Sequence, residues 1–156
     1  MSGWLNPSRV FKYTKILYDP PVKYGGRGEE MIRGIGIDIV EIARIRKLLD
    51  SYGTNFLQKV FTKSEIRYCS EKAHPEIHFA GRWAAKEAFY KALPDTLQAT
   101  AGWKCIAVLP QSGQGRPVIS LQGGAFSDAC LAEGISSFHL SISHERAYCT
   151  AVVAME

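Results

Sequence analysis

The pattern of hydrophobic and polar positions along the chain becomes regular only from Met31 onward. Residues 1–30 mix scattered aromatic side chains with Pro20-Pro21 and Gly25-Gly26, and they show no sustained period of 2.0 or 3.6. We therefore expect a loosely ordered extension over 1–30, either the product of an upstream start codon or a functional arm. A single folded domain is expected over 31–156.

The first regular segment predicts a strand followed by a helix. Isoleucines around two glycines indicate a buried strand over 32–40, with Asp38 near its end. The next apolar residues recur at helical spacing and predict a helix over 41–52 that ends at Gly53.

Two further helices have recognisable starting signals. Thr62-Lys63-Ser64-Glu65 is a capping-box pattern, which predicts a helix running toward Glu71. Pro75 is a favourable first residue for the longest helix, which we expect to continue to about Leu93, just before Pro94. These signals come from local chemistry and do not say which face of either helix is buried.

The C-terminal half predicts strands with one inserted helix. Strands are expected over 105–109 and 117–121 around the turn-rich segment 111–115, then a helix over 125–133 and a hairpin of 138–143 with 147–154. This succession predicts an α+β domain with a mainly antiparallel sheet packed with a long helix.

Composition narrows the class of protein without naming a function. The chain has 156 residues, of which 46% are hydrophobic and 22% charged, and this is ordinary for a globular domain. No apolar run approaches the roughly 18 residues that a membrane span needs, so no membrane role is expected. The net charge of +4 permits an acidic partner but is too weak to indicate nucleic acid, and we expect none.

The cysteines favour a reducing compartment. The chain contains four, at positions 69, 105, 130 and 149, and no two of them form a C-x-x-C pair. A disulfide or zinc framework usually has tighter spacing. Small buried thiols in the cytoplasm are therefore the expected state.

Asp38 is the first candidate for chemistry. An acid near the end of an apolar strand is costly to bury without a partner. It can cap the following helix or bind a ligand, and the residue alone leaves both readings open.

The segment 79–92 offers a richer set of charged residues. On a helix Arg82 and Lys86 share one face, and Glu87 and Lys91 share another. An ordinary amphipathic helix would explain these pairs. Together with Asp38, however, they supply what a magnesium–pyrophosphate site requires, although spacing does not prove that the two carboxylates converge.

The last candidate segment is Ser141-Ile142-Ser143-His144 at the end of a predicted strand. Alternation places His139 and the two serines on one face, with His144 at the turn. No G-x-S-x-G motif accompanies them, which argues against a hydrolase triad. A turn histidine of this kind is either structural, simply exposed or functional.

These motifs together strongly resemble the holo-[acyl-carrier-protein] synthase family of 4′-phosphopantetheinyl transferases. The matching pieces are Gly34-Ile35-Gly36-Ile37-Asp38 followed by Arg44, then 61–65, the segment 81–92 and Ser141-Ile142-Ser143-His144. Their order and separation match the family along 31–156. Residues 1–30 have no counterpart in it, and the turn at 112–117 is longer than the family's usual one.

The resemblance implies a fold, a reaction and a set of site residues. The implied enzyme transfers the 4′-phosphopantetheine arm of coenzyme A to a serine of an acyl carrier protein, in fatty acid biosynthesis, with Mg²⁺ as cofactor. Asp38 and Glu87 would bind the metal, and Glu87 would take the serine proton directly or through a metal-bound water. Lys86 and Lys91 would lie near the phosphates and Lys91 would act in catalysis. The remaining implied coenzyme ligands are Arg82, Ser143 and His144.

The resemblance also implies two protein partners. Arg44 would meet the acidic carrier protein, and Arg46 and Lys47 complete a basic cluster on the same predicted helix. The family is typically a homotrimer with coenzyme A at the subunit interfaces.

Two alternative functions remain: a non-catalytic domain that binds RNA or an acidic protein, and a transferase that serves carrier proteins of secondary metabolism.

Overall fold

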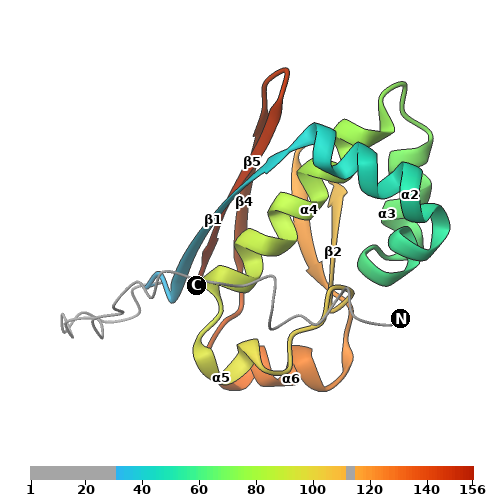
Figure 1. Cartoon of the computed structure of the whole chain (residues 1–156). Helices are drawn as coiled ribbons and strands as arrows, with labels where there is room; N and C mark the ends of the chain where they lie inside the picture. The colour runs from blue at the N-terminus through green and yellow to red at the C-terminus, as the bar shows by residue number, and fades with distance from the viewer. Residues whose placement is uncertain (1–30, 112–114) are drawn as a thin grey trace.

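The computed structural model describes residues 31–111 and 115–156, so the predicted extension over 1–30 and the middle of the 111–115 turn lie outside it. Figure 1 shows an α+β arrangement, as the sequence predicted. The elements are, in chain order, β1 (Gly34–Glu41), α2 (Ile42–Val60), α3 (Lys63–Ser70), α4 (Pro75–Ala92), α5 (Asp95–Gln98), β2 (Ile106–Pro110), β3 (Pro117–Leu121), α6 (Gly124–Ala132), β4 (Phe138–His144) and β5 (Tyr148–Met155).

Two antiparallel sheets are arranged around the central helix α4. One has the strand order β1-β5-β4, and the other is the hairpin β2-β3. Helix α4 packs against β1 and β5 on one side and against α2 and α3 on the other, as Figure 1 shows. Every residue from Phe79 to Phe89 is buried, because α4 is covered on several sides and forms the axis of the core. Among the described residues, no helix combines the length and the apolar character that a membrane crossing requires.

Strand β1 is buried on one face only, which corrects the prediction of a buried strand. Gly36 and Val40 face α4, whereas Ile35, Ile37 and Ile39 are 62%, 61% and 67% exposed on the opposite face. The prediction was wrong for the single chain because it treated every isoleucine as a core residue. The strand period of two in fact gives the inner face to the glycines and the outer face to the isoleucines.

The helix signals mostly gave the right boundaries. Thr62 caps α3 through a complete capping box with Glu65, and Pro75 begins α4, as predicted. Gly53 does interrupt α2, with φ 46° and ψ −125°, but the helix resumes beyond it and ends only at Val60. That second half and the short helix α5 were not predicted.

All four cysteines are free, and Cys69, Cys130 and Cys149 are buried, in agreement with the prediction of buried thiols. Burial raises the pKa of the Cys69 thiol to about 12 and that of Cys149 to about 11. These thiols are therefore protonated and unreactive near neutral pH.

Candidate active site

Two glycines bring β1 into direct contact with α4. A side-chain Cβ at Gly34 would collide with the backbone carbonyl of Ala92, and one at Gly36 with that of Ala88. Only glycine permits this approach of strand and helix. The contact places Asp38, two residues farther along the same face of β1, against the side of α4.

Asp38 and Lys91 form an ion pair at this contact. Lys91 Nζ donates to Asp38 Oδ1 at 2.7 Å and to the backbone carbonyl of Ile37 at 3.1 Å. The pair is only partly buried, with side-chain exposures of 29% for Lys91 and 14% for Asp38. Burial raises the pKa of Asp38 in spite of the nearby Lys91 ammonium. The fold thus holds a carboxylate where its ionised form is under-solvated.

Glu87 lies one helical turn before Lys91. Residues four apart on a helix share a face, with their Cβ atoms roughly 5–6 Å apart. Glu87 is 5% exposed, so α4 presents a buried carboxylate beside the Asp38–Lys91 pair. The structure therefore gathers Asp38, Glu87 and Lys91 on one side of α4, which the spacing in the sequence could not establish.

This donor set suits a hard divalent cation that is shared with phosphate. The described residues contain no group of three or more histidine, cysteine or acidic side chains that could form a complete metal cage. Mg²⁺ usually takes one or two protein carboxylates and completes its shell with water and phosphate oxygens. Asp38 and Glu87, one from β1 and one from α4, match that requirement.

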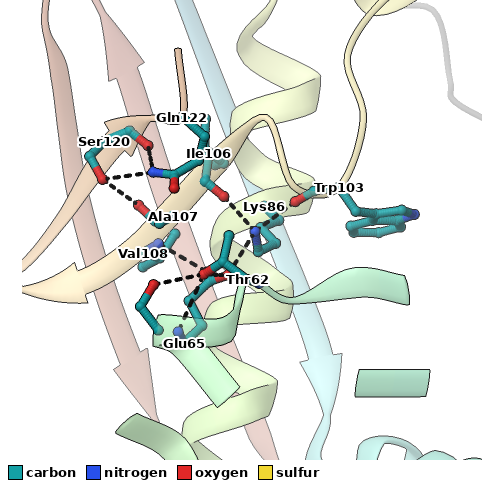
Figure 2. A network of polar contacts seen from close by, with 10 residues as sticks. Thr62, Glu65, Lys86, Trp103, Ile106, Ala107, Val108, Ser120 and Gln122 are labelled. Atoms are coloured by element: carbon teal, nitrogen blue, oxygen red, sulfur yellow. Dashed lines mark hydrogen bonds and ion pairs between the residues drawn. The ribbon is translucent and has the colours of Figure 1, made fainter. Parts of the chain in front are cut away.

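Lys86, the residue before Glu87, lies in a network of polar contacts that Figure 2 shows. Its ammonium donates to the carbonyls of Trp103 at 2.6 Å and Ile106 at 2.8 Å, and it lies 3.1 Å from Glu65 Oε2. Lys86 is 3% exposed, and all three of its N–H donors have acceptors. This position in the interior differs from the expected place beside the phosphates, because Lys86 points toward α3 and β2.

Glu65 completes that network with both of its oxygens. Oε1 accepts from the Val108 amide at 2.9 Å, and Oε2 accepts from the Thr62 amide at 2.8 Å and the Thr62 hydroxyl at 2.9 Å. The side chain of Glu65 has no exposed surface. The Glu65–Lys86 pair therefore joins α3, α4 and β2 at a fully satisfied polar site within the core.

A second group of cations lies toward the other end of α4. Arg82 is 7% exposed, and His78, four residues earlier, lies within electrostatic reach of both Arg82 and His144. Burial, and then the positive charges of Arg82 and Lys72, lower the pKa of His78. Arg82 and His144 were predicted from the sequence as coenzyme ligands, whereas His78 was not, although it lies only four positions before Arg82.

Ser143 faces away from Asp38. It pairs across β5 with Thr150, which in turn pairs with the exposed Ile39 of β1, so these three side chains point to the outer face of the sheet. Asp38 pairs with Ala151 on the inner face. One chain therefore does not bring Ser143 to the side where Asp38 and Lys91 meet.

The expected carrier-binding residues lie on the surface of α2. Arg44, Arg46 and Lys47 are all exposed there, as their place on a solvated helix requires. Arg46 is tethered, because its guanidinium donates to Glu76 Oε1 of α4 at 2.9 Å.

A family model and individual known sequences both match this chain, and they agree on the family. The model of the 4′-phosphopantetheinyl transferase superfamily matches residues 34–153. The chain is 42% identical over 126 residues to holo-[acyl-carrier-protein] synthase from Syntrophus aciditrophicus, which covers 81% of this chain and 97% of that protein. It is 45% identical over 127 residues to the enzyme of the same name from Halothermothrix orenii, covering 81% and 98% of the two chains.

Solved structures give the same result. Holo-[acyl-carrier-protein] synthase from Neisseria meningitidis superposes with a TM-score of 0.70 and 32% identity, covering 81% of this chain and 99% of that one. The enzyme from Helicobacter pylori, solved with coenzyme A, gives a TM-score of 0.65 and 30% identity, covering 78% and 99%. On this sequence and structural similarity, the chain belongs to the 4′-phosphopantetheinyl transferase superfamily.

Proposed function

We propose that this enzyme transfers the 4′-phosphopantetheine group of coenzyme A to a serine of an apo acyl carrier protein. The products are the holo carrier protein and adenosine 3′,5′-bisphosphate. The observation that carries the proposal is the Asp38–Lys91 pair with Glu87 one turn away, which lies within the part of the chain that matches the family. The match also covers 97% and 98% of the length of the two relatives that are named for this activity.

We further propose that Mg²⁺ is required and that Asp38 and Glu87 hold it. A bound Mg²⁺ would neutralise pyrophosphate charge and polarise the phosphorus under attack. Lys91 is placed to stabilise the departing bisphosphate, because its flexible ammonium is partly exposed beside Asp38. Glu87 is the carboxylate that can accept the proton of the carrier serine. Lys86 supports this site from within the core.

We place the nucleotide near Arg82 and His144. Coenzyme A carries a pyrophosphate and a separate phosphomonoester on its ribose, and α4 presents two separate groups of cations. Arg82 and Lys91 are nine positions apart, which corresponds to roughly 13 Å and two and a half turns of a helix, so the two side chains leave α4 on opposite sides. Arg82 lies on the side of Tyr68 and α3, and Lys91 lies on the side of β1, so a coenzyme A that meets both groups would lie between two subunits.

We propose that the outer face of β1 and its sheet packs against another copy of the chain in a homotrimer. Ile35, Ile37 and Ile39 form a row of isoleucines more than half exposed, and Tyr148 and Val152 of β5 are 51% and 40% exposed on the same sheet. A contiguous apolar surface of this kind indicates a protein interface. It would also bring Ser143 into a site shared between subunits. A chain that remains monomeric at micromolar concentration in light scattering would contradict this assembly.

The carrier protein would dock on α2, where Arg44, Arg46 and Lys47 present positive charge to an acidic surface. We place the reaction in the cytoplasm and in fatty acid biosynthesis. The four free cysteines suit a reducing compartment. If the carrier docks on the cations of α2, its KM should rise with ionic strength, and the KM for coenzyme A should change less.

Mass spectrometry of an apo acyl carrier protein tests the proposed reaction. The carrier is incubated with the enzyme and coenzyme A, with Mg²⁺ or with EDTA. We expect the carrier to gain the mass of one phosphopantetheine group only in the sample with metal. No gain with any of several fatty-acid-type carriers would overturn the proposed reaction, and an equal gain in EDTA would overturn the metal requirement.

A further inference from the structure

Arg82 is buried as a cation without a carboxylate partner among the described residues. Its side chain forms one long hydrogen bond, from NH1 to the carbonyl of His78 at 3.5 Å. Its Nε is buried and has no hydrogen-bond partner within the described part of the chain. A guanidinium has five N–H donors, so most of its donor capacity is unused. Burying such a group is costly unless a ligand completes its environment.

The ring of Tyr68 is the feature that holds this guanidinium in place. Arg82 Cζ lies 4.6 Å from the centroid of the Tyr68 ring, and Lys72 Nζ lies 4.3 Å from the same centroid. The His78 ring meets Tyr68 edge-on, with centroids 6.1 Å apart and an interplanar angle of 83°. One aromatic ring on α3 thus collects three basic side chains, from α4 and from the segment that joins α3 to α4.

The surrounding charges favour an anion at this place. His78 is within electrostatic reach of Arg82, Lys72 and His144, and among the residues that the structure describes only the carboxylate of Glu76 acts on His78 in the opposite sense. Glu76 is already bound to Arg46. A cluster with this excess of positive charge repels itself when empty and is stabilised by a phosphate group.

We propose that Tyr68 is a positioning residue for nucleotide binding: its ring face fixes the Arg82 guanidinium so that the unused donors meet a phosphate group, with Lys72 adding positive charge and His78 lying beside the same ring. The proposal rests on the proposed function, because the phosphate is that of coenzyme A or of its product adenosine 3′,5′-bisphosphate. Tyr68 contacts Arg82, so it would act through the arginine.

Calorimetric titration with adenosine 3′,5′-bisphosphate tests this without a carrier protein or turnover. Tyr68→Met keeps most of the side-chain volume but removes the ring, and we expect affinity to fall roughly tenfold. Tyr68→Phe keeps the ring and should bind within about twofold of the wild type. Tyr52→Leu, an exposed tyrosine of α2, is the matched control and should change nothing. In turnover, Tyr68→Met should raise the KM for coenzyme A and leave kcat nearly unchanged.

A double variant separates positioning from general packing. Once Arg82→Gln has removed the guanidinium, adding Tyr68→Met should cause little further loss of affinity. Wild-type affinity in Tyr68→Met, or an undiminished effect of Tyr68→Met in the Arg82→Gln background, would overturn the proposal. If the wild type itself fails to bind the bisphosphate, the proposed function fails and not only this refinement of it.

A measurement on the wild-type protein makes the result independent of how the variants fold. The Nε–H signal of Arg82 in a ¹⁵N NMR spectrum, assigned by its loss in Arg82→Lys, should be shifted by the ring current of Tyr68. It should move again on titration with the bisphosphate and saturate with the calorimetric Kd. An Arg82 signal that does not respond to the ligand would overturn the proposal.

Discussion

Helix α4 carries two lysines, five positions apart, that each pair with a carboxylate, and the two pairs differ in how completely they are satisfied. Lys86 and Glu65 have side-chain exposures of 2% and 0%, whereas Lys91 and Asp38 have 29% and 14%. The first pair is enclosed by three further donors to Glu65 and two backbone carbonyls on Lys86.

The contrast shows how one helix can serve both the core and the site. In the Glu65–Lys86 pair no donor of the ammonium remains, so a ligand can gain nothing there. In the Asp38–Lys91 pair, Asp38 Oδ1 is engaged and the carboxylate remains partly exposed, so a cation and a phosphate can replace the internal contact. Both pairs join a lysine to a carboxylate, and what distinguishes the buried pair from the pair proposed to act in the site is how completely their hydrogen bonds are satisfied.

The largest expected effect is on stability, from Lys86→Met. Removing one partner leaves Glu65 as an unpaired buried charge, which typically costs about 3–5 kcal/mol in free energy of unfolding. Lys91→Met is the matched control, and it should cost less than about 1 kcal/mol because its partner is partly solvated. Urea unfolding followed by circular dichroism measures both. Similar losses in the two variants would break the comparison.

Asp38→Asn should have the opposite profile, with activity lost and the fold retained. Without the carboxylate, transfer at ordinary Mg²⁺ concentration should fall at least about a hundredfold, or about 2.7 kcal/mol in activation free energy. Burial raises the pKa of Asp38, so the folded protein holds this proton more tightly than the unfolded chain does. The ionised carboxylate therefore costs stability above that pKa, and the variant should be slightly more stable than the wild type at pH 7.

Two measurements check this prediction: transfer rate by mass spectrometry and unfolding as a function of pH. The stability difference between variant and wild type should shrink as the pH falls through the raised pKa of folded Asp38 toward the ordinary aspartate value of 3.8. It should be lost below that value, where both chains are neutral at this position. Undiminished transfer by Asp38→Asn would exclude Asp38 as a metal ligand.

Local signals in the sequence predicted the elements that depend on near neighbours. Three such features could be predicted from the sequence, because each acts within one or two helical turns: the capping box at Thr62, the proline that begins α4 and the break at Gly53. The hydrogen bond to Glu65 Oε1 could not be predicted. This oxygen accepts from the Val108 amide, 43 residues away, and no local pattern encodes that contact.

The site was only partly predictable for the same reason. The resemblance implies one site for Asp38, Glu87 and Lys91. The structure shows how Asp38 and Lys91 meet, since Gly34 and Gly36 let β1 approach α4. The resemblance did not show that Lys86, the residue before Glu87 on α4, is directed into the core. Tyr68 was missed because its role depends on α3 packing beside Arg82, which residue type and spacing do not reveal.

Lys91→Met sharpens the functional half of the comparison, with a smaller effect than Asp38→Asn. Lys91 would compete with the proposed Mg²⁺ for Asp38 Oδ1, so its removal should lower the Mg²⁺ concentration needed for half-maximal activity. The loss of its positive charge at the leaving group should reduce kcat, by roughly tenfold. Opposite changes in these two quantities are the expected result. An unchanged kcat would remove Lys91 from the reaction and leave it only a partner of Asp38.

The smallest effect concerns the end of α4 where the cations have no comparable carboxylate. Burial and the neighbouring charges of Arg82, Lys72 and His144 lower the pKa of His78 from its ordinary value of 6.5, with only Glu76 opposing. Below pH 6.5 the unfolded chain therefore binds a proton more readily, and stability should fall as the pH falls. His78→Phe should weaken this dependence, whereas His74→Gln, at an exposed histidine, should leave it unchanged. Melting temperatures between pH 7.5 and 5.5 measure the difference.

Saturating adenosine 3′,5′-bisphosphate should also weaken the pH dependence of the wild-type melting temperature, because an anion beside His78 favours its protonated form. A pH dependence that neither His78→Phe nor the ligand changes would show that these basic side chains do not act as one group.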